Sequence, residues 1–146
     1  MNGIFSFISS FFAPLLPLLF KKKENVKQFE KLRFDIAAAL TMYARYFHNP
    51  VDLARQADHS LPQDYKTASA ELRKLGSVAS ALAETTPEKK LPISKADLLC
   101  VSKNLIGLSN SMCTPYNSGS SREDRAVARE YELEIRNLLR IDNSAS

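Results

Sequence analysis

The fold class follows from one stretch, residues 65 to 82, which reads YKTASAELRKLGSVASAL. Its apolar residues alternate in steps of three and four through three heptads, at Tyr65, Ala68, Leu72, Leu75, Ala79 and Leu82. This spacing gathers them on one side of an α-helix, as in helices that pack lengthwise against other helices. We predict a helix over residues 61 to 84, opened by a capping box of Ser60 and Gln63. Gly76 indicates either close packing or simple tolerance, because glycine weakens a helix interior.

Three further segments on either side of that stretch carry helical periodicity. They cover residues 26 to 47, the residues that follow Ser94 as N-cap, and the residues that follow Ser121. Their predicted inner faces hold Phe29, Leu32, Ile36, Leu40, Tyr43 and Phe47, then Leu98, Val101, Leu105, Leu108 and Met112, then Ala128, Tyr131, Ile135 and Leu138. No strand pattern interrupts them, and the links between them contain proline or glycine. We therefore predict an all-α chain, with an antiparallel four-helix bundle over residues 21 to 142 and a frayed tail over residues 143 to 146.

A second unusual stretch precedes the bundle. Residues 3 to 20, GIFSFISSFFAPLLPLLF, contain no charged side chain and are followed directly by Lys21, Lys22 and Lys23. As a helix this stretch would be about 27 Å long, close to the thickness of a thin hydrocarbon core. A cleavable signal peptide would need basic residues before the apolar run and small residues behind it, and neither is present. We predict that residues 1 to 20 are a membrane anchor.

An interfacial helix is the alternative for the same residues. Small or polar residues fall on one helical stripe and bulky apolar residues on the other, but the polar stripe carries no charge, whereas interfacial helices are usually basic there. We therefore prefer the interpretation that these residues span the membrane, and a helix lying in the headgroup plane remains the alternative. Ser6 and Ser10 have the spacing of small residues at helix contacts in lipid, so self-association of this segment into a homo-oligomer also stays open.

The positive charge of the chain is concentrated beside the anchor. The net charge is +4, with seven basic and three acidic residues between positions 21 and 45 and thirteen of each after that. Because basic flanks stay in the cytoplasm, we expect a single-pass protein of the inner membrane of a bacterium-like cell, with its N-terminus outside and its bundle in the cytoplasm. No separate basic patch with interleaved aromatic residues indicates nucleic-acid binding.

Helices that alternate in direction would return two further basic segments to the membrane, the link between the second and third helices and the C-terminus. The predicted membrane surface, with lipid as its partner, then comprises Lys21, Lys22, Lys23, Lys27, Lys89, Lys90, Arg136 and Arg140. The opposite end of the bundle would expose aromatic residues and a histidine, which are common in protein interfaces. The predicted site for an unknown protein partner comprises Tyr43, Tyr46, Phe47, His48 and Tyr116.

Residues capable of catalysis or metal binding are few. The two cysteines, Cys100 and Cys113, and the two histidines, His48 and His59, show none of the spacings typical of a metal site. Cys113 and His48 could meet at one end of a bundle, but many bundles bring such residues together by coincidence. No glycine-rich phosphate loop is present. We therefore expect no cofactor, no metal and no enzymatic activity.

Two functions are compatible with these features. The first is a non-enzymatic, membrane-tethered helical bundle that binds another protein through its membrane-distal end. The second is a membrane-active protein, similar in effect to a toxin or a phage-exclusion factor, that oligomerises through its N-terminal helix. Replacing Ser6 and Ser10 with leucine separates them, because only the second function should then be lost while membrane targeting persists.

Overall fold

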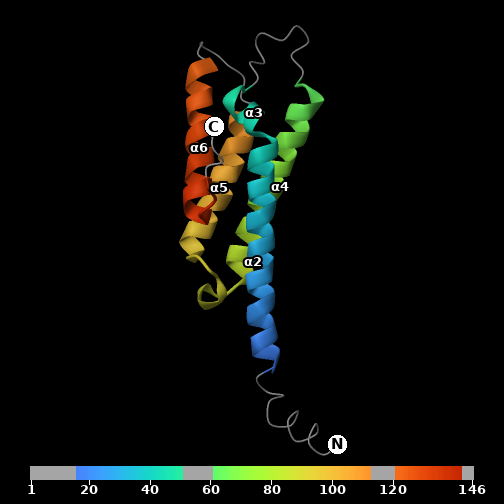
Figure 1. Ribbon diagram of the computed structural model, residues 1–146, viewed down its shortest axis with the longest axis vertical. Coiled ribbons are helices and arrows are strands. Elements are labelled where there is room, and N and C mark those ends of the chain that lie inside the picture. Colours follow the sequence, from blue (N-terminus) through green and yellow to red (C-terminus); the bar gives the residue numbers. More distant parts are fainter. Residues whose placement is uncertain (1–15, 51–60, 113–120, 143–146) are drawn as a thin grey trace, which may run out of the picture.

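The computed structural model describes residues 16–50, 61–112 and 121–142, and these segments form helices with no strand among them (Figure 1). The elements are α2 (Leu16–Met42), α3 (Ala44–His48), α4 (Gln63–Thr85), the short 3-10 helix η2 (Glu88–Lys90), α5 (Lys95–Ser111) and α6 (Ser121–Leu139). The prediction of the all-α class is confirmed for these residues.

The four longer helices α2, α4, α5 and α6 run alternately up and down, and they pack side by side (Figure 1). The most extensive packing joins α4 to α5, followed by α5 to α6, while α2 packs on α4 and α3 on α6. The short helix η2 contacts α2 and lies at the end of the bundle where α2 begins. We call this the proximal end, and the opposite end, where α3 lies, the distal end.

The core is built from the predicted apolar stripes. The largest fully buried apolar side chains are Ile36, Leu40, Phe47, Leu72, Leu98, Val101, Leu105, Leu108, Met112 and Ile135. Tyr43, Tyr65, Tyr131 and Leu138 are only partly buried and pack against this core. Burial of a side chain of this size contributes about 1.5–3 kcal/mol. The helical periodicity therefore located the core on all four longer helices.

Small residues allow α4 and α5 to approach closely. A Cβ atom on Gly76 would lie 3.0 Å from Cγ1 of Ile106 and 3.2 Å from the carbonyl oxygen of Ser102. The buried hydroxyl of Ser102 donates to the Gly76 carbonyl at 2.6 Å. About two helical turns away, the hydroxyl groups of Ser69 and Ser109 lie 2.7 Å apart and join the same two helices. Of the two explanations for Gly76, close packing is therefore the correct one.

The end of the first helix differs from the prediction, whereas its start before residue 26 agrees with an expectation that the helix can continue directly out of the N-terminal segment. The helix starts at Leu16, continues without a break through the lysine run, and ends at Met42. Tyr43 then leaves the helical conformation, with φ −101° and ψ 9°. The separate helix α3 packs on α6, and its Tyr46 ring meets the Tyr65 ring of α4. The predicted single helix over residues 26 to 47 is wrong in this respect, because the chain forms two helices that meet at Tyr43. Phe47, which the prediction placed on the inner face, is fully buried on α3.

The predicted helix starts have mixed outcomes. Ser94 caps α5, where its side chain accepts a hydrogen bond from the Asp97 amide at 3.0 Å, as predicted. The capping box predicted for α4 is wrong, because this helix begins at Gln63 with Pro62 as its N-cap.

None of the helices in the described part of the chain is long and apolar enough to cross a bilayer. Residues 1–15 of the predicted membrane anchor lie outside the described residues, as does the predicted frayed tail, residues 143–146.

Candidate functional site

An aromatic cluster holds the distal ends of α3 and α4 together. The rings of Tyr46 and Tyr65 meet edge to face with centroids 4.6 Å apart, and the ring of Tyr43 lies 6.1 Å from that of Tyr46. The Arg45 guanidinium lies 4.5 Å from the centroid of the Tyr46 ring and also donates to its hydroxyl. Tyr65 donates from its hydroxyl to the Asn49 carbonyl at 2.6 Å. These contacts fix the chain where it leaves α3.

Burial changes the acidity of this cluster. It raises the pKa of Tyr43, because the phenolate loses solvation, and the negative charges of Glu71 and of ionised Tyr46 raise it further. Burial also raises the pKa of Tyr65, an effect that the nearby Arg45 partly offsets. Both side chains therefore stay protonated to a higher pH than an ordinary tyrosine.

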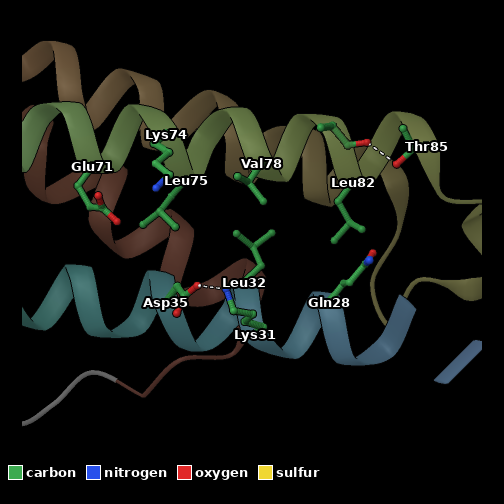
Figure 2. Close-up of a pocket in the computed structure, with 11 residues that line it drawn as sticks. Gln28, Lys31, Leu32, Asp35, Glu71, Lys74, Leu75, Val78, Leu82 and Thr85 are labelled. Carbon is green, nitrogen blue, oxygen red and sulfur yellow. Dashed lines mark hydrogen bonds and ion pairs between the residues drawn. The ribbon is translucent and has the colours of Figure 1, made fainter. Parts of the chain in front are cut away.

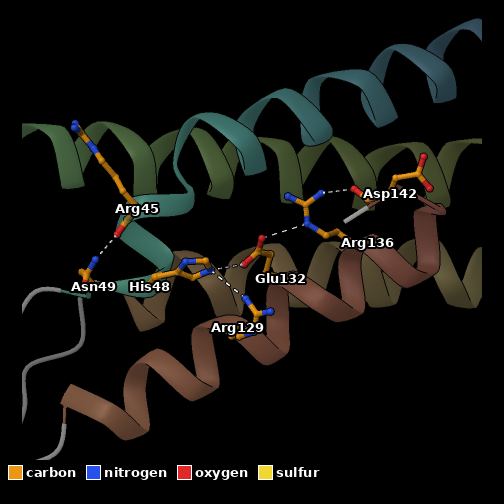
Figure 3. A network of polar contacts seen from close by, with 7 residues as sticks. All are labelled: Arg45, His48, Asn49, Arg129, Glu132, Arg136 and Asp142. Carbon is orange, nitrogen blue, oxygen red and sulfur yellow. Dashed lines mark hydrogen bonds and ion pairs between the residues drawn. The ribbon is translucent and has the colours of Figure 1, made fainter. Parts of the chain in front are cut away.

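A network of charged groups connects α3 to α6 (Figure 3). His48 Nε2 lies 3.2 Å from Glu132 Oε2, and Arg136 Nε donates to Glu132 Oε1 at the same distance of 3.2 Å. Arg136 also donates to the carbonyl oxygen of Asp142 at 3.0 Å. Glu132 is 6% exposed and Arg136 5%. Burying charge is costly unless it is paired, so Glu132 serves as the shared partner that makes this arrangement tolerable.

A basic hollow lies beside this network on the distal surface. It has a volume of about 410 Å³ and is lined by His48, Arg125, Ala126 and Arg129. Arg125 and Arg129 are four positions apart on α6 and therefore share a face. Arg129 also lies 3.5 Å from His48 Nε2. We call these four residues the basic hollow. Its guanidinium groups suit carboxylates or phosphates, which accept paired N–H bonds.

The predicted partner site is only partly exposed. Tyr43 and His48 reach the surface, whereas Tyr46 is 7% exposed and Phe47 is fully buried. These two residues are corrected from surface to buried positions, because Tyr46 packs edge to face on Tyr65 of α4 and Phe47 lies in the hydrophobic core. Tyr116 lies outside the described residues.

The sequence interpretation missed Arg125 and Arg129. Their spacing of four residues was visible, but their position beside His48 depends on the bend at Tyr43.

The residues of the predicted membrane surface are also only partly exposed. Lys89 and Lys90 lie in η2 at the proximal end, and Lys27 is exposed on α2. Arg136 is corrected from a surface residue to a buried one, because it pairs with Glu132. Arg140 is exposed just beyond α6. Lys21, Lys22 and Lys23 belong to α2, but their side chains lie outside the described residues.

Within residues 16–50, 61–112 and 121–142, no three His, Cys, Asp or Glu side chains come together in a way that could hold a metal ion. Cys113, the possible nucleophile opposite His48, lies outside these ranges.

The fold defines a small all-helical bundle protein with a basic hollow at one end. No protein-family model, curated protein or solved structure matches the chain.

Proposed function

We propose that the protein is a non-enzymatic, membrane-tethered helical bundle that binds an acidic segment of a protein partner at its distal end. The basic hollow carries this proposal. Two of its four lining residues, Arg125 and Arg129, carry guanidinium groups, His48 adds an imidazole ring, and the hollow is open to solvent at the surface. An aspartate- or glutamate-rich segment would place its carboxylates against these groups, which form strong charge-assisted hydrogen bonds.

The geometry of the surrounding residues favours a preformed site. The aromatic cluster fixes α3, and the pair of Glu132 with Arg136 anchors α6 at the same level as His48. A site on such fixed elements loses little conformational freedom when a partner binds. The site offers cations rather than a nucleophile with an adjacent base, which suits recognition better than catalysis.

The tether is proposed from the path of α2. The helix continues unbroken from Leu16 past three lysines into the bundle, and Figure 1 shows its first turns extending beyond η2. Lys89 and Lys90 lie at that same end. An anionic inner leaflet would attract each basic residue near its surface by about 1 kcal/mol. In this proposal residues 3 to 20 cross the inner membrane with the N-terminus outside and the bundle in the cytoplasm.

Photocrosslinking of the full-length chain in native membranes tests the partner site. A photoreactive amino acid in place of Ala126, within the basic hollow, is expected to capture a protein whose crosslinked peptide is acidic. Arg129→Glu should lower the yield about tenfold, since one charged hydrogen bond contributes about 1.5–3 kcal/mol. Lys103→Glu, an exposed charge reversal on α5, is the matched control and should have no effect. Capture of lipid and the protein itself alone would refute the partner site.

Membrane fractionation tests the tether separately. The full-length protein is expected to stay with the membrane pellet after extraction at alkaline pH, and an arginine in place of Phe12 should release it. Recovery of the unaltered protein in the supernatant would exclude the tether without affecting the partner site.

A further inference from the structure

The hollows on the bundle surface differ in the charges that line them. The groove between α2 and α4 has a volume of about 430 Å³, and its edges carry two basic and two acidic side chains, Lys31, Lys74, Asp35 and Glu71 (Figure 2). Lys31 and Asp35 pair with each other at 3.5 Å. A hollow between α5 and α6 combines one lysine with one glutamate, Lys103 and Glu134. The basic hollow differs from both, because two arginines and no acidic residue line it.

The two arginines of the basic hollow, Arg125 and Arg129, lie one helical turn apart on α6. Like charges at this spacing repel each other and weaken a helix slightly. In the part of the chain that the structure describes, no carboxylate pairs with Arg129, whose side chain contacts His48 Nε2 at 3.5 Å. The nearby carboxylate of Glu132 places one oxygen at His48 and the other at Arg136. The described residues therefore leave the charge of Arg129 available to a ligand.

We propose that the residue of the partner that enters the basic hollow is a phosphorylated serine or threonine. This inference rests on the proposed function, because it specifies which acidic group of the partner's segment the hollow binds. A phosphate monoester carries a charge of about −1.5 to −2 at neutral pH and three strong acceptor oxygens. A carboxylate carries a single negative charge on two oxygens. The phosphate therefore matches the charge of two arginines, whereas one carboxylate matches the charge of one.

The spacing of Arg125 and Arg129 also fits a phosphate. The Cβ atoms of residues four positions apart on a helix lie about 5–6 Å from each other, so both guanidinium groups can reach one anion. Each guanidinium group can donate two parallel N–H bonds, and a phosphate has enough oxygens to accept from both groups. A phosphate bound between them would also remove their mutual repulsion. Arginine clusters of this kind are a recurring way to recognise phosphorylated segments.

The place of the basic hollow favours a phosphate on a protein over one on a lipid. The hollow lies at the distal end of the bundle, whereas α2 begins at the proximal end (Figure 1). In the proposed arrangement the membrane is at the proximal end, so lipid headgroups are on the opposite side of the bundle from Arg125 and Arg129.

Fluorescence anisotropy of a labelled peptide, with the full-length protein in detergent micelles, tests this proposal. The peptide carries one phosphoserine flanked by glutamates, and a second peptide has glutamate in place of the phosphoserine. The phosphorylated peptide is expected to have a dissociation constant about tenfold lower or more, because the additional charge-assisted hydrogen bonds are strong.

Variants of the basic hollow locate the phosphate. Arg125→Gln and Arg129→Gln should each raise the dissociation constant of the phosphorylated peptide about tenfold or more. Both side chains are exposed, so the circular dichroism spectrum should stay unchanged. Arg129→Lys keeps the charge without the paired donors and should recover only part of the loss. Lys103→Gln, which removes an exposed charge on α5, is the matched control and should leave the affinity unchanged.

The outcomes separate this inference from the function on which it rests. A glutamate peptide that binds as tightly as the phosphorylated one would overturn the phosphate assignment and leave the binding of an acidic segment intact. Failure of both peptides to bind would overturn both. Unchanged affinity in the Arg125→Gln and Arg129→Gln variants would place the phosphate outside the basic hollow. Displacement of the peptide by an equal concentration of inorganic phosphate would assign the hollow to the free ion instead of a protein segment.

Discussion

Arg33 on α2 donates from Nε to the carbonyl oxygen of Leu139 at the end of α6, at 2.7 Å and across 106 positions of the chain. A second guanidinium nitrogen donates to the Arg140 carbonyl at 2.8 Å. The last carbonyls of a helix have no partner within the helix, and a positive charge is favourable there because of the helix dipole. One side chain therefore joins the first described helix to the last.

Arg33→Met is expected to destabilise the protein by about 1–2 kcal/mol, because both carbonyl oxygens lose a charged donor. Because the Arg33 side chain is partly exposed, water can replace part of the lost hydrogen bonding. Urea unfolding monitored by circular dichroism measures the effect. Lys31→Met is the control, since the pairing of Lys31 with Asp35 is exposed and should be worth less than about 0.5 kcal/mol. Equal stability of the two variants would contradict a capping role for Arg33.

The buried pair of Glu132 and Arg136 predicts a strongly non-additive result. Glu132→Leu alone should cost about 3–5 kcal/mol, because it leaves the Arg136 guanidinium buried without its partner. The double variant Glu132→Leu, Arg136→Met should recover most of this loss, since no unpaired charge is then buried. A double-mutant cycle by urea unfolding checks the prediction. A double variant that is no more stable than Glu132→Leu would show that the pair is not the source of the cost.

Arg140 ends α6 in a left-handed conformation, with φ 53°. The Ile141 amide donates to the Arg136 carbonyl at 2.9 Å and the Arg140 amide to the Asn137 carbonyl at 3.3 Å, which is a Schellman arrangement. Glycine occupies this conformation without strain, so Arg140→Gly should stabilise the protein by about 0.5–1 kcal/mol and raise its melting temperature. Arg140→Ala retains a Cβ atom and is expected to give no such gain. A gain of the same size in both variants would exclude backbone strain as the cause.

The distal tyrosines predict a loss of stability in alkali. The pKa values of Tyr43 and Tyr65 are raised in the folded state, so at high pH the folded protein binds more protons than the unfolded chain. The contribution of these two phenol groups to the free energy of unfolding is complete below the ordinary tyrosine pKa of about 10. It is lost as the pH rises through their raised pKa values. Urea midpoints measured from about pH 8 to about pH 11 should therefore fall.

Tyr43→Phe provides the control for this pH dependence, because it removes the phenol and keeps the ring. Its urea midpoint should fall less steeply with pH than that of the unaltered protein. Spectroscopic titration of tyrosinate absorbance should also lose a component that titrates above the ordinary range. Identical pH profiles would show that Tyr43 does not carry the effect.

Periodicity predicted the all-helical class and the core without help from tertiary structure. Helical spacing is a local property, so stripes such as Leu72, Leu75 and Ala79 identify both a helix and its buried side. The N-cap at Ser94 was predictable for the same reason, because its partner, the Asp97 amide, is only three residues away.

Other features depended on contacts between segments far apart in the sequence. The bend at Tyr43 is stable because α3 gains contacts with α6, which no pattern within residues 26 to 47 could reveal. With that bend, His48 lies next to Arg129. Charged residues such as Arg136 are normally expected at the surface. Arg136 can be buried because its guanidinium group donates hydrogen bonds to Glu132 and to the Asp142 carbonyl oxygen.

The membrane anchor over residues 1 to 20 stays a prediction from the sequence alone, which rests on the absence of charge and on the lysines that follow. What the sequence determined was therefore the four longer helices and their buried faces, because each depends on neighbouring residues. Tertiary structure alone decided which polar groups meet, because the basic hollow, the contact of His48 with Glu132 and the cap of α6 by Arg33 all join helices that are distant in the chain.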